Sequence, residues 1–141
     1  MMTEYELLKQ GKDQYMSDVQ KDFFRSKLLG MKKQTEERLQ KTRAIMSKLS
    51  MSSGSLDKAT GSEICDITLI RIKRDVYVYH EIELALGRLR QDTFGYCEKT
   101  GMPLGIPRLL ANPFAKYTVS ALIRYGCDTG RKVTHDLKIE L

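Results

Sequence analysis

Hydrophobic residues recur at spacings of three and four along a first long stretch of the chain, which is the pattern of an amphipathic helix. In order, this stripe consists of Phe24, Leu28, Met31, Thr35, Leu39, Thr42, Met46 and Leu49. Ser17 to Gln20 precedes it with a capping-box pattern, in which the Ser17 hydroxyl accepts from a first-turn N–H and the Gln20 side chain reaches back. We therefore expect a helix from Ser17 to about Leu49, roughly 48 Å long at 1.5 Å per residue.

The second long stretch gives two conflicting signals. Ile67 to Tyr79 is rich in β-branched and aromatic residues, which favour strands. The helical spacing nevertheless runs through this segment and beyond it, over Cys65, Leu69, Ile72, Val76, Tyr79, Ile82, Leu86 and Leu89. Because periodicity over a long window outweighs residue propensity, we expect one helix from Asp57 to Asp92. The polar turn SMSSG between the two helices then predicts an antiparallel coiled-coil hairpin.

The segment that follows is dense in turn-forming residues. All three prolines lie between Phe94 and Ala121, and Gly95 and Gly101 lie on either side of Cys97. Proline lacks the N–H and glycine supplies positive φ, so a regular helix is not expected there. The order of glycine, aromatic residue, cysteine, glycine, tight apolar turn and short helix has the outline of a zinc knuckle. Thr100, however, occupies the place of the second cysteine in a C-x-x-C pair.

A short helix is predicted near the end of this segment, starting at Asn112 and Pro113 and stopping at Gly126. The beginning of the chain has only a weak apolar pattern, which indicates a short helix or a loose lead-in. The tail after the knuckle gives no firm prediction. The expected organisation is a lead-in at 1–16, a hairpin at 17–92 with its tip at 50–59, a knuckle at 93–126 and a tail at 127–141.

Composition narrows the functional classes. The chain has 141 residues, of which 41% are hydrophobic and 30% charged, with a formal net charge of +6. That excess is modest and spread along the chain, so it admits nucleic acid or an acidic protein surface as partner. Three cysteines far apart argue against a disulfide framework and for a reducing compartment, and no apolar run approaches the roughly 18 residues that span a bilayer. We expect a cytoplasmic protein without a membrane partner.

These segments resemble the DksA/TraR-type transcription factors of bacteria. YMSDVQKDFFRSKLL resembles the start of that family's first coiled-coil helix, and FGYCEKTGMPLGIPRLLANPFAKY resembles its knuckle. The resemblance implies a mainly α fold, with a long antiparallel coiled-coil hairpin attached to a small degenerate zinc-finger-like domain that carries a C-terminal helix. It also implies a monomer that inserts its hairpin tip into the secondary channel of RNA polymerase, between the β and β′ subunits. There it would modulate initiation, as in the stringent response at ribosomal RNA promoters.

The resemblance assigns the acting residues of the tip. Aligned without gaps, Asp57 and Ala59 fall on the family's tip pattern of Asp, two residues, Asp, one residue, Ala. Gly54 occupies the position of the first Asp, so Asp57 is the one carboxylate retained. The alternative is that Asp57 is an ordinary helix N-cap and Ala59 a good helix former.

Basic positions of the family are retained only in part. Arg74 in the hairpin and Arg108 in the knuckle match them and are the implied polymerase contacts. Family contacts to guanosine tetraphosphate fall on Glu81, Asn112 and Leu122, none of which is basic. Guanosine tetraphosphate is thus a possible co-regulator of the family whose contact positions this chain does not retain.

The resemblance also implies how the knuckle differs from its relatives. The four zinc-ligand positions of the family fall on Cys97, Thr100, Thr118 and Ala121. A structural zinc site needs about four ligands, and one thiolate cannot hold the ion. We expect a zinc-independent knuckle without a cofactor, in which packing replaces the metal. The apolar residues available are Met102, Leu104, Ile106, Leu109, Leu110, Phe114 and Val119.

Alternatives remain at this stage. Cys97 is a buried inert thiol, a redox thiol, or a metal ligand together with Cys127 and His135. The chain as a whole could instead be a nucleic-acid-binding knuckle protein, or a coiled-coil adaptor or antagonist that occupies the polymerase channel without activity. Sequence-specific DNA binding is not expected, because no recognition-helix pattern or stacking platform is present. An enzyme is not expected either, because no nucleophile, base and orienting group converge on any motif.

Overall fold

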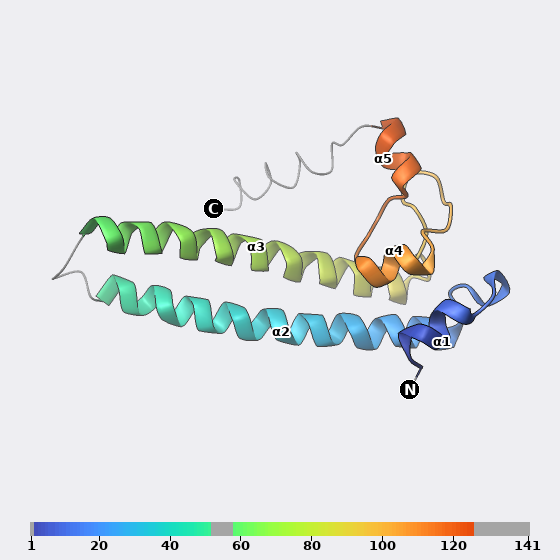
Figure 1. Ribbon diagram of the computed structural model, residues 1–141, viewed down its shortest axis with the longest axis horizontal. Helices are drawn as coiled ribbons and strands as arrows, with labels where there is room; N and C mark the ends of the chain where they lie inside the picture. Colours follow the sequence, from blue (N-terminus) through green and yellow to red (C-terminus); the bar gives the residue numbers. More distant parts are fainter. Residues whose placement is uncertain (1, 52–57, 126–141) are drawn as a thin grey trace.

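Two long antiparallel helices lie side by side and the short elements gather at one end of them (Figure 1). The computed structural model describes residues 2–51 and 58–125. The elements are α1 (Glu4–Lys9), a 3₁₀ helix (Lys12–Gln14), α2 (Asp18–Met51), α3 (Lys58–Arg90), α4 (Ile106–Ala111) and α5 (Val119–Tyr125). The predicted mainly α fold with a long helical hairpin and a C-terminal helix is thus confirmed. Residues 52–57 of the predicted tip, Gly126 and the tail lie outside the described residues.

The segment with strand-like composition is helical. Ile67 to Tyr79 lies wholly inside α3, as the periodicity predicted. Across the described ranges, the β pairing consists of an isolated antiparallel bridge between Tyr96 and Pro103 in the knuckle. None of the helices described is both long and apolar enough to cross a membrane.

The start of α2 follows the predicted cap with one difference. The Ser17 hydroxyl accepts from the Gln20 N–H at 3.4 Å, as expected. The Gln20 side-chain oxygen, however, accepts from the N–H of Met16 at 2.9 Å rather than from Ser17. Met16 has a φ of 56°, and this left-handed turn presents its N–H to the helix end. The capping box was therefore wrong in its second bond.

The hydrophobic core lies at the base of the hairpin, where the two long helices meet the short elements. Phe24 of α2 packs on Phe94 of the knuckle with ring centroids 5.5 Å apart. Residues of this core with essentially no exposure are Leu7, Phe24, Leu28, Ile82, Ala85, Phe94 and Leu109. Because this core joins α1, α2, α3, α4 and the knuckle, it fixes the direction in which the hairpin projects.

The seam between α2 and α3 is more polar than predicted. The α2 stripe is confirmed, with Thr35 only 1% exposed. On α3 the stripe was wrong at Leu69, which is 38% exposed, because Thr68 and Asp75 lie in the seam instead, at 6% and 3%. These two are seven residues apart, and a strict seven-residue repeat is what keeps side chains facing a coiled-coil partner.

The last helix begins later than predicted. Asn112 ends α4: its N–H donates to the Arg108 carbonyl, and its side-chain oxygen accepts from the Phe114 N–H at 3.3 Å in a local turn. The Thr118 hydroxyl instead accepts from the Ala121 N–H at 3.1 Å and so caps α5. A start at Asn112 and Pro113 was therefore wrong, because the asparagine side chain closes a turn there.

Candidate functional site: hairpin tip and metal-free knuckle

α3 begins at the end of the hairpin that is far from the knuckle (Figure 1). Ala59 is in the first turn of α3, which begins at Lys58. Asp57 directly precedes that helix and lies outside the described residues, as does Gly54. The assignment of Asp57 and Ala59 as acting residues therefore stays a prediction.

The knuckle turn closes around Cys97. The Cys97 N–H donates to the Met102 carbonyl at 2.8 Å, and the Gly101 N–H donates back to the Cys97 carbonyl at 2.9 Å. The Thr118 hydroxyl lies 3.9 Å from the Cys97 sulfur, and Ala121 is 3% exposed. Thr100 and Thr118 thus both contact Cys97, and the Ala121 N–H donates to the Thr118 hydroxyl. Of these four residues, Cys97 alone carries a thiol.

The environment of Cys97 stabilises its thiolate form. The sulfur is buried, and burial alone raises the pKa of a thiol. Hydrogen bonds from the Thr100 hydroxyl and from the N–H groups of Thr118, Thr100 and Lys99 outweigh that effect and lower the pKa of Cys97 to about 6. Hydrogen-bond donors of this kind would stabilise a sulfur bound to a metal, and here they surround the sulfur of a free cysteine.

This pKa shift predicts how stability depends on pH. Because the Cys97 pKa is about 6 in the folded chain and about 8.5 in unfolded peptides, ionised Cys97 favours the folded state above pH 8.5, and this contribution is lost as pH falls toward 6. We expect Tm to fall more between pH 9 and pH 6 in the wild type than in Cys97→Ala. Thermal melts followed by circular dichroism under a reducing agent would measure it, and equal slopes would contradict the shift.

The residues present do not fit a zinc ion. One thiol, two hydroxyls and a methyl group stand at the four positions, and hydroxyls and methyls are not zinc ligands. Within residues 2–51 and 58–125, no group of three His, Cys, Asp or Glu side chains is placed to hold a metal. Cys127 and His135, the other ligands considered, lie outside these ranges.

A tyrosine from the other end of the chain joins the two halves of the knuckle. The Tyr15 hydroxyl donates to the Gly95 carbonyl oxygen and accepts from the Gly105 N–H at 3.1 Å. Sequence reasoning missed this role: Tyr15 begins the segment that resembles the family's first helix, but nothing there indicates a contact with the knuckle. The nearest signal is Gly95, whose φ of 88° and lack of a side chain let Tyr15 and Met16 approach.

Arg88 of α3 holds the knuckle from the other side. Its side chain is largely buried, and it donates to the Phe114 carbonyl at 3.3 Å while lying 3.8 Å from the Glu98 carboxylate. Burial lowers the pKa of this guanidinium, although Glu98 and Glu81 partly oppose the effect. Arg88 and Tyr15 together supply polar links that hold the knuckle to the base of the hairpin.

Packing residues of the knuckle were predicted correctly only in part. Leu104 and Leu109 are buried, and Ile106, Leu110 and Phe114 pack against the core. Met102 and Val119 are 61% and 56% exposed, so their assignment to the packing was wrong. Met102 contributes its backbone carbonyl to the turn instead, and Val119 begins the exposed helix α5.

The two implied polymerase contacts lie on separate elements. Arg74 is exposed near the midpoint of α3, whereas Arg108 is half-buried in α4. The Arg108 Nε donates to the Tyr117 carbonyl at 2.9 Å, which ties α4 to the following loop. Arg108 therefore has a structural contact within the knuckle whatever else it binds.

The positions of the family's nucleotide contacts have other uses here. Glu81 is 5% exposed and pairs with Lys116 at 3.1 Å. Asn112 ends α4, and Leu122 is half-buried in α5. None of the three offers a cationic side chain.

Comparisons with known proteins identify relatives of this chain. The chain is 33% identical to the RNA polymerase-binding transcription factor DksA of Caulobacter vibrioides over 115 residues, which are 79% of each protein. It is 29% identical to the factor of the same name from Escherichia coli K12, over 73% of this chain and 69% of that one. It is 30% identical to General stress protein 16O of Bacillus subtilis, over 74% of this chain and 60% of that one.

The solved structure of transcription factor DksA2 from Pseudomonas aeruginosa superposes with a TM-score of 0.81 and 32% identity, covering 87% of this chain and 95% of that one. No protein-family model matches the sequence. Identity above 30% over more than two thirds of the chain, the shared hairpin and the shared knuckle lead to one conclusion: this chain belongs to the DksA family.

Proposed function

We propose that this chain is a transcription regulator that binds RNA polymerase, as its relatives are named for doing. The observation that carries the proposal is the long hairpin of α2 and α3, which projects from a small cap (Figure 1). A 34-residue helix such as α2 is about 50 Å long at 1.5 Å per residue. A rod of that length reaches deep into a channel from a cap that remains outside.

The more detailed mechanism that we propose depends on the predicted tip residue Asp57. The hairpin enters the secondary channel between the β and β′ subunits, acting as a monomer in the cytoplasm, and carries Asp57 toward the polymerase active centre. The carboxylate there alters the mobile elements of the active centre and shortens the life of promoter open complexes. The chain itself makes and breaks no covalent bond in this mechanism, so it is a regulator and not an enzyme.

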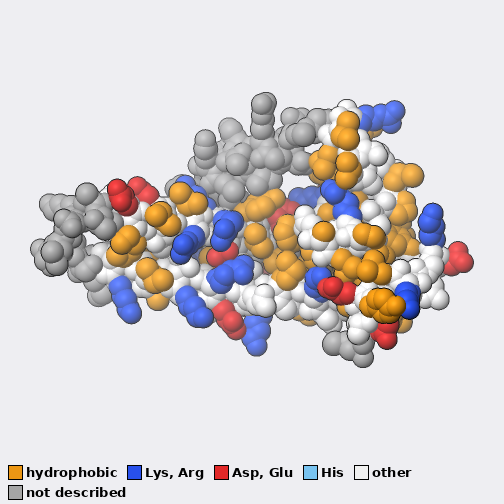
Figure 2. Space-filling model, in the orientation of Figure 1, with side chains coloured by type: hydrophobic (Ala, Val, Ile, Leu, Met, Phe, Trp, Pro, Cys, Tyr) orange, Lys and Arg blue, Asp and Glu red, His pale blue; other side chains and the backbone are white. Residues whose placement is uncertain are grey.

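The surface of the rod suits a protein partner. Lys and Arg side chains stand along the visible face of the hairpin among exposed hydrophobic ones (Figure 2). The exposed apolar side chains of the two long helices include Ile45, Ile64, Ile67 and Ile70. Exposed isoleucines can be buried in an interface with another protein, whereas they make no favourable contact with the phosphates of nucleic acid. Their presence therefore favours polymerase over nucleic acid as the partner.

Neither a metal nor guanosine tetraphosphate at the family's position belongs to this proposal. Hydrogen bonds from Tyr15 and Arg88 hold the segments of the knuckle in place, so a structural zinc ion is not needed for that purpose. The ion pair between Glu81 and Lys116 occupies the place of a basic nucleotide contact. We therefore propose that the regulator acts without zinc and without that nucleotide at that site.

The first test is a substitution at the tip. Asp57→Asn removes one charge without changing side-chain size, so binding to polymerase should persist while the effect on open complexes is lost. Open-complex lifetime at a ribosomal RNA promoter, measured after adding a DNA competitor, reports this effect. We expect wild type to shorten the lifetime severalfold and Asp57→Asn to leave it unchanged.

Asp66→Asn is the matched control, because Asp66 is exposed on α3 and the substitution removes the same charge at a position nine residues after Asp57. It should act like wild type. If wild-type protein competes for polymerase but leaves lifetimes unchanged, the chain occupies the channel without regulating it. If it does not bind polymerase at all, the proposed function is wrong.

A further inference from the structure

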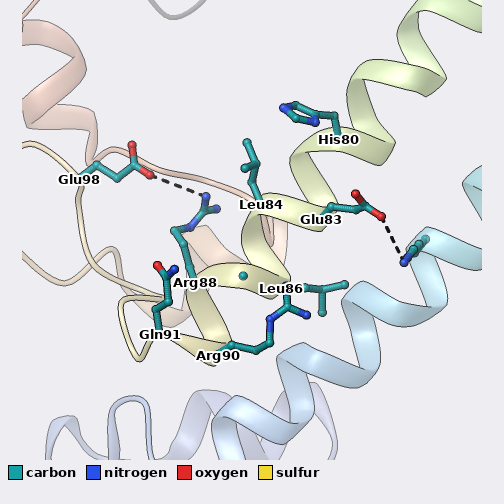
Figure 3. Close-up of a pocket in the computed structure, with 10 residues that line it drawn as sticks. His80, Glu83, Leu84, Leu86, Arg88, Arg90, Gln91 and Glu98 are labelled. Atoms are coloured by element: carbon teal, nitrogen blue, oxygen red, sulfur yellow. Dashed lines mark ion pairs between the residues drawn. The ribbon is translucent and has the colours of Figure 1, made fainter.

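A groove lies at the base of the hairpin, on α3 next to the knuckle (Figure 3). Its volume is about 510 Å³, and its walls come from three segments distant in the sequence. The last turns of α3 form the floor, and Lys32 of α2 and Glu98 of the knuckle also line the groove. Glu98 follows Cys97 directly, so the groove borders the cysteine turn.

The cations of this groove have loosely held counterions. Lys32 lies 3.4 Å from Glu83, and Arg88 lies 3.8 Å from Glu98, both longer than a good charge-assisted hydrogen bond. The two carboxylates are 48% and 44% exposed, so each can turn toward solvent. Arg90 is exposed and has no ion pair among those of the described residues. The groove can therefore accept a further negative charge.

Gly87 leaves bare backbone on the groove floor. In a helix interior glycine costs about 1 kcal/mol relative to alanine. Within residues 2–51 and 58–125 no contact requires it, since a Cβ at Gly87 would meet only the Arg90 guanidinium, at an ordinary 3.8 Å. Leu84, one turn earlier on the same face, is 40% exposed. A glycine that the fold does not need, beside an exposed leucine and an unpaired arginine, marks a place where another chain can approach closely.

We propose that this groove receives an acidic side chain of RNA polymerase, with its backbone lying over Gly87, its apolar neighbour on Leu84 and its carboxylate on Arg90. This inference rests on the proposed function and adds a second contact at the base of the hairpin. Arginine's planar fork matches a carboxylate. The groove also contains Glu83 and Glu98, so its lining carries three cations, Lys32, Arg88 and Arg90, and two carboxylates. That balance suits one carboxylate and disfavours a polyphosphate.

The test uses substitutions that separate folding from binding. Gly87→Leu fills the floor and improves helix propensity, so the variant should melt at or above the wild-type temperature yet bind polymerase at least tenfold more weakly. Gly30→Leu is the matched control: Gly30 is inside α2, exposed, with nothing within 4 Å of its Cβ. It should gain the same helix propensity and bind like wild type. Arg90→Ala should weaken binding about tenfold, the effect of losing one charge-assisted contact.

Affinity would be measured with fluorescently labelled full-length chain and purified polymerase of the same organism. If wild type binds and Gly87→Leu and Arg90→Ala bind equally well, the groove inference is overturned while the proposed function stands. If wild type does not bind, the proposed function fails and the groove inference fails with it. Calorimetric titration of the free chain with pyrophosphate should show no saturable binding. Saturable binding that Arg90→Ala abolishes would identify a polyphosphate pocket and overturn the assignment to an acidic side chain.

Discussion

Gly95→Ala is expected to destabilise the chain by about 3 kcal/mol, because two separate costs add at this position. The Gly95 φ of +88° lies in a region that costs side-chain-bearing residues roughly 1–2 kcal/mol. A Cβ there would also lie 2.7 Å from the Met16 sulfur and 3.1 Å from the Tyr15 hydroxyl. Overpacking of this kind costs roughly 1–3 kcal/mol. Neither neighbour can yield easily, since Met16 is buried and Tyr15 is hydrogen bonded to both halves of the knuckle.

Gly101→Ala separates these costs. Gly101 is in the same knuckle and has a φ of +73°, but nothing lies within 4 Å of its Cβ. Only the backbone cost remains, so we expect a loss of about 1 kcal/mol. Urea unfolding with an unchanged m value would compare the two variants. Equal losses would show that Tyr15 and Met16 do not close over Gly95.

How much of this fold the sequence could predict depends on the range of the interactions. The hairpin was predictable because helical periodicity is a local signal repeated over more than thirty residues in each long helix. The bond between Tyr15 and Gly95 joins residues 80 positions apart and leaves no local pattern. It became visible only once α2 and α3 had brought the N-terminal segment against the knuckle.

Register within the hairpin shows a second limit. Hydrophobicity alone selects Leu69 as the seam residue, since its neighbour Thr68 is polar. The structure selects Thr68, whose hydroxyl satisfies itself by donating to the Ile64 carbonyl at 2.6 Å. A seven-residue spacing from Thr68 to Asp75 was the available signal, and it competes with the apolar pattern.

The candidate site divides in the same way. The set of Cys97, Thr100, Thr118 and Ala121 came from resemblance to a knuckle; in the structure Thr100 and Thr118 contact Cys97, and Ala121 is hydrogen bonded to Thr118. The groove around Gly87 gave no sequence signal beyond a glycine in a helix. Its charged walls come from α2, α3 and the knuckle, so only tertiary structure assembles them.

Arg38→Ala is expected to destabilise the chain by about 2 kcal/mol, because it leaves the buried Asp75 carboxylate without the half-exposed cation that pairs with it. The Asp75 side chain is 4% exposed in the seam, and its Oδ1 lies 3.4 Å from the Arg38 Nε. Arg38 also donates to the Thr35 hydroxyl at 3.3 Å, so one guanidinium serves two buried polar groups. Urea unfolding of the full chain would measure the loss.

Two comparisons test whether burial is the cause. Arg25→Ala breaks a pair with Asp22 on the same helix, but Asp22 is 72% exposed, so the loss should stay below about 0.5 kcal/mol. Asp75→Leu in the Arg38→Ala background should restore most of the stability, since a leucine in the seam needs no cation. If the double variant remains as unstable as Arg38→Ala alone, the cost lies in the lost packing of the arginine stem and not in the unpaired Asp75.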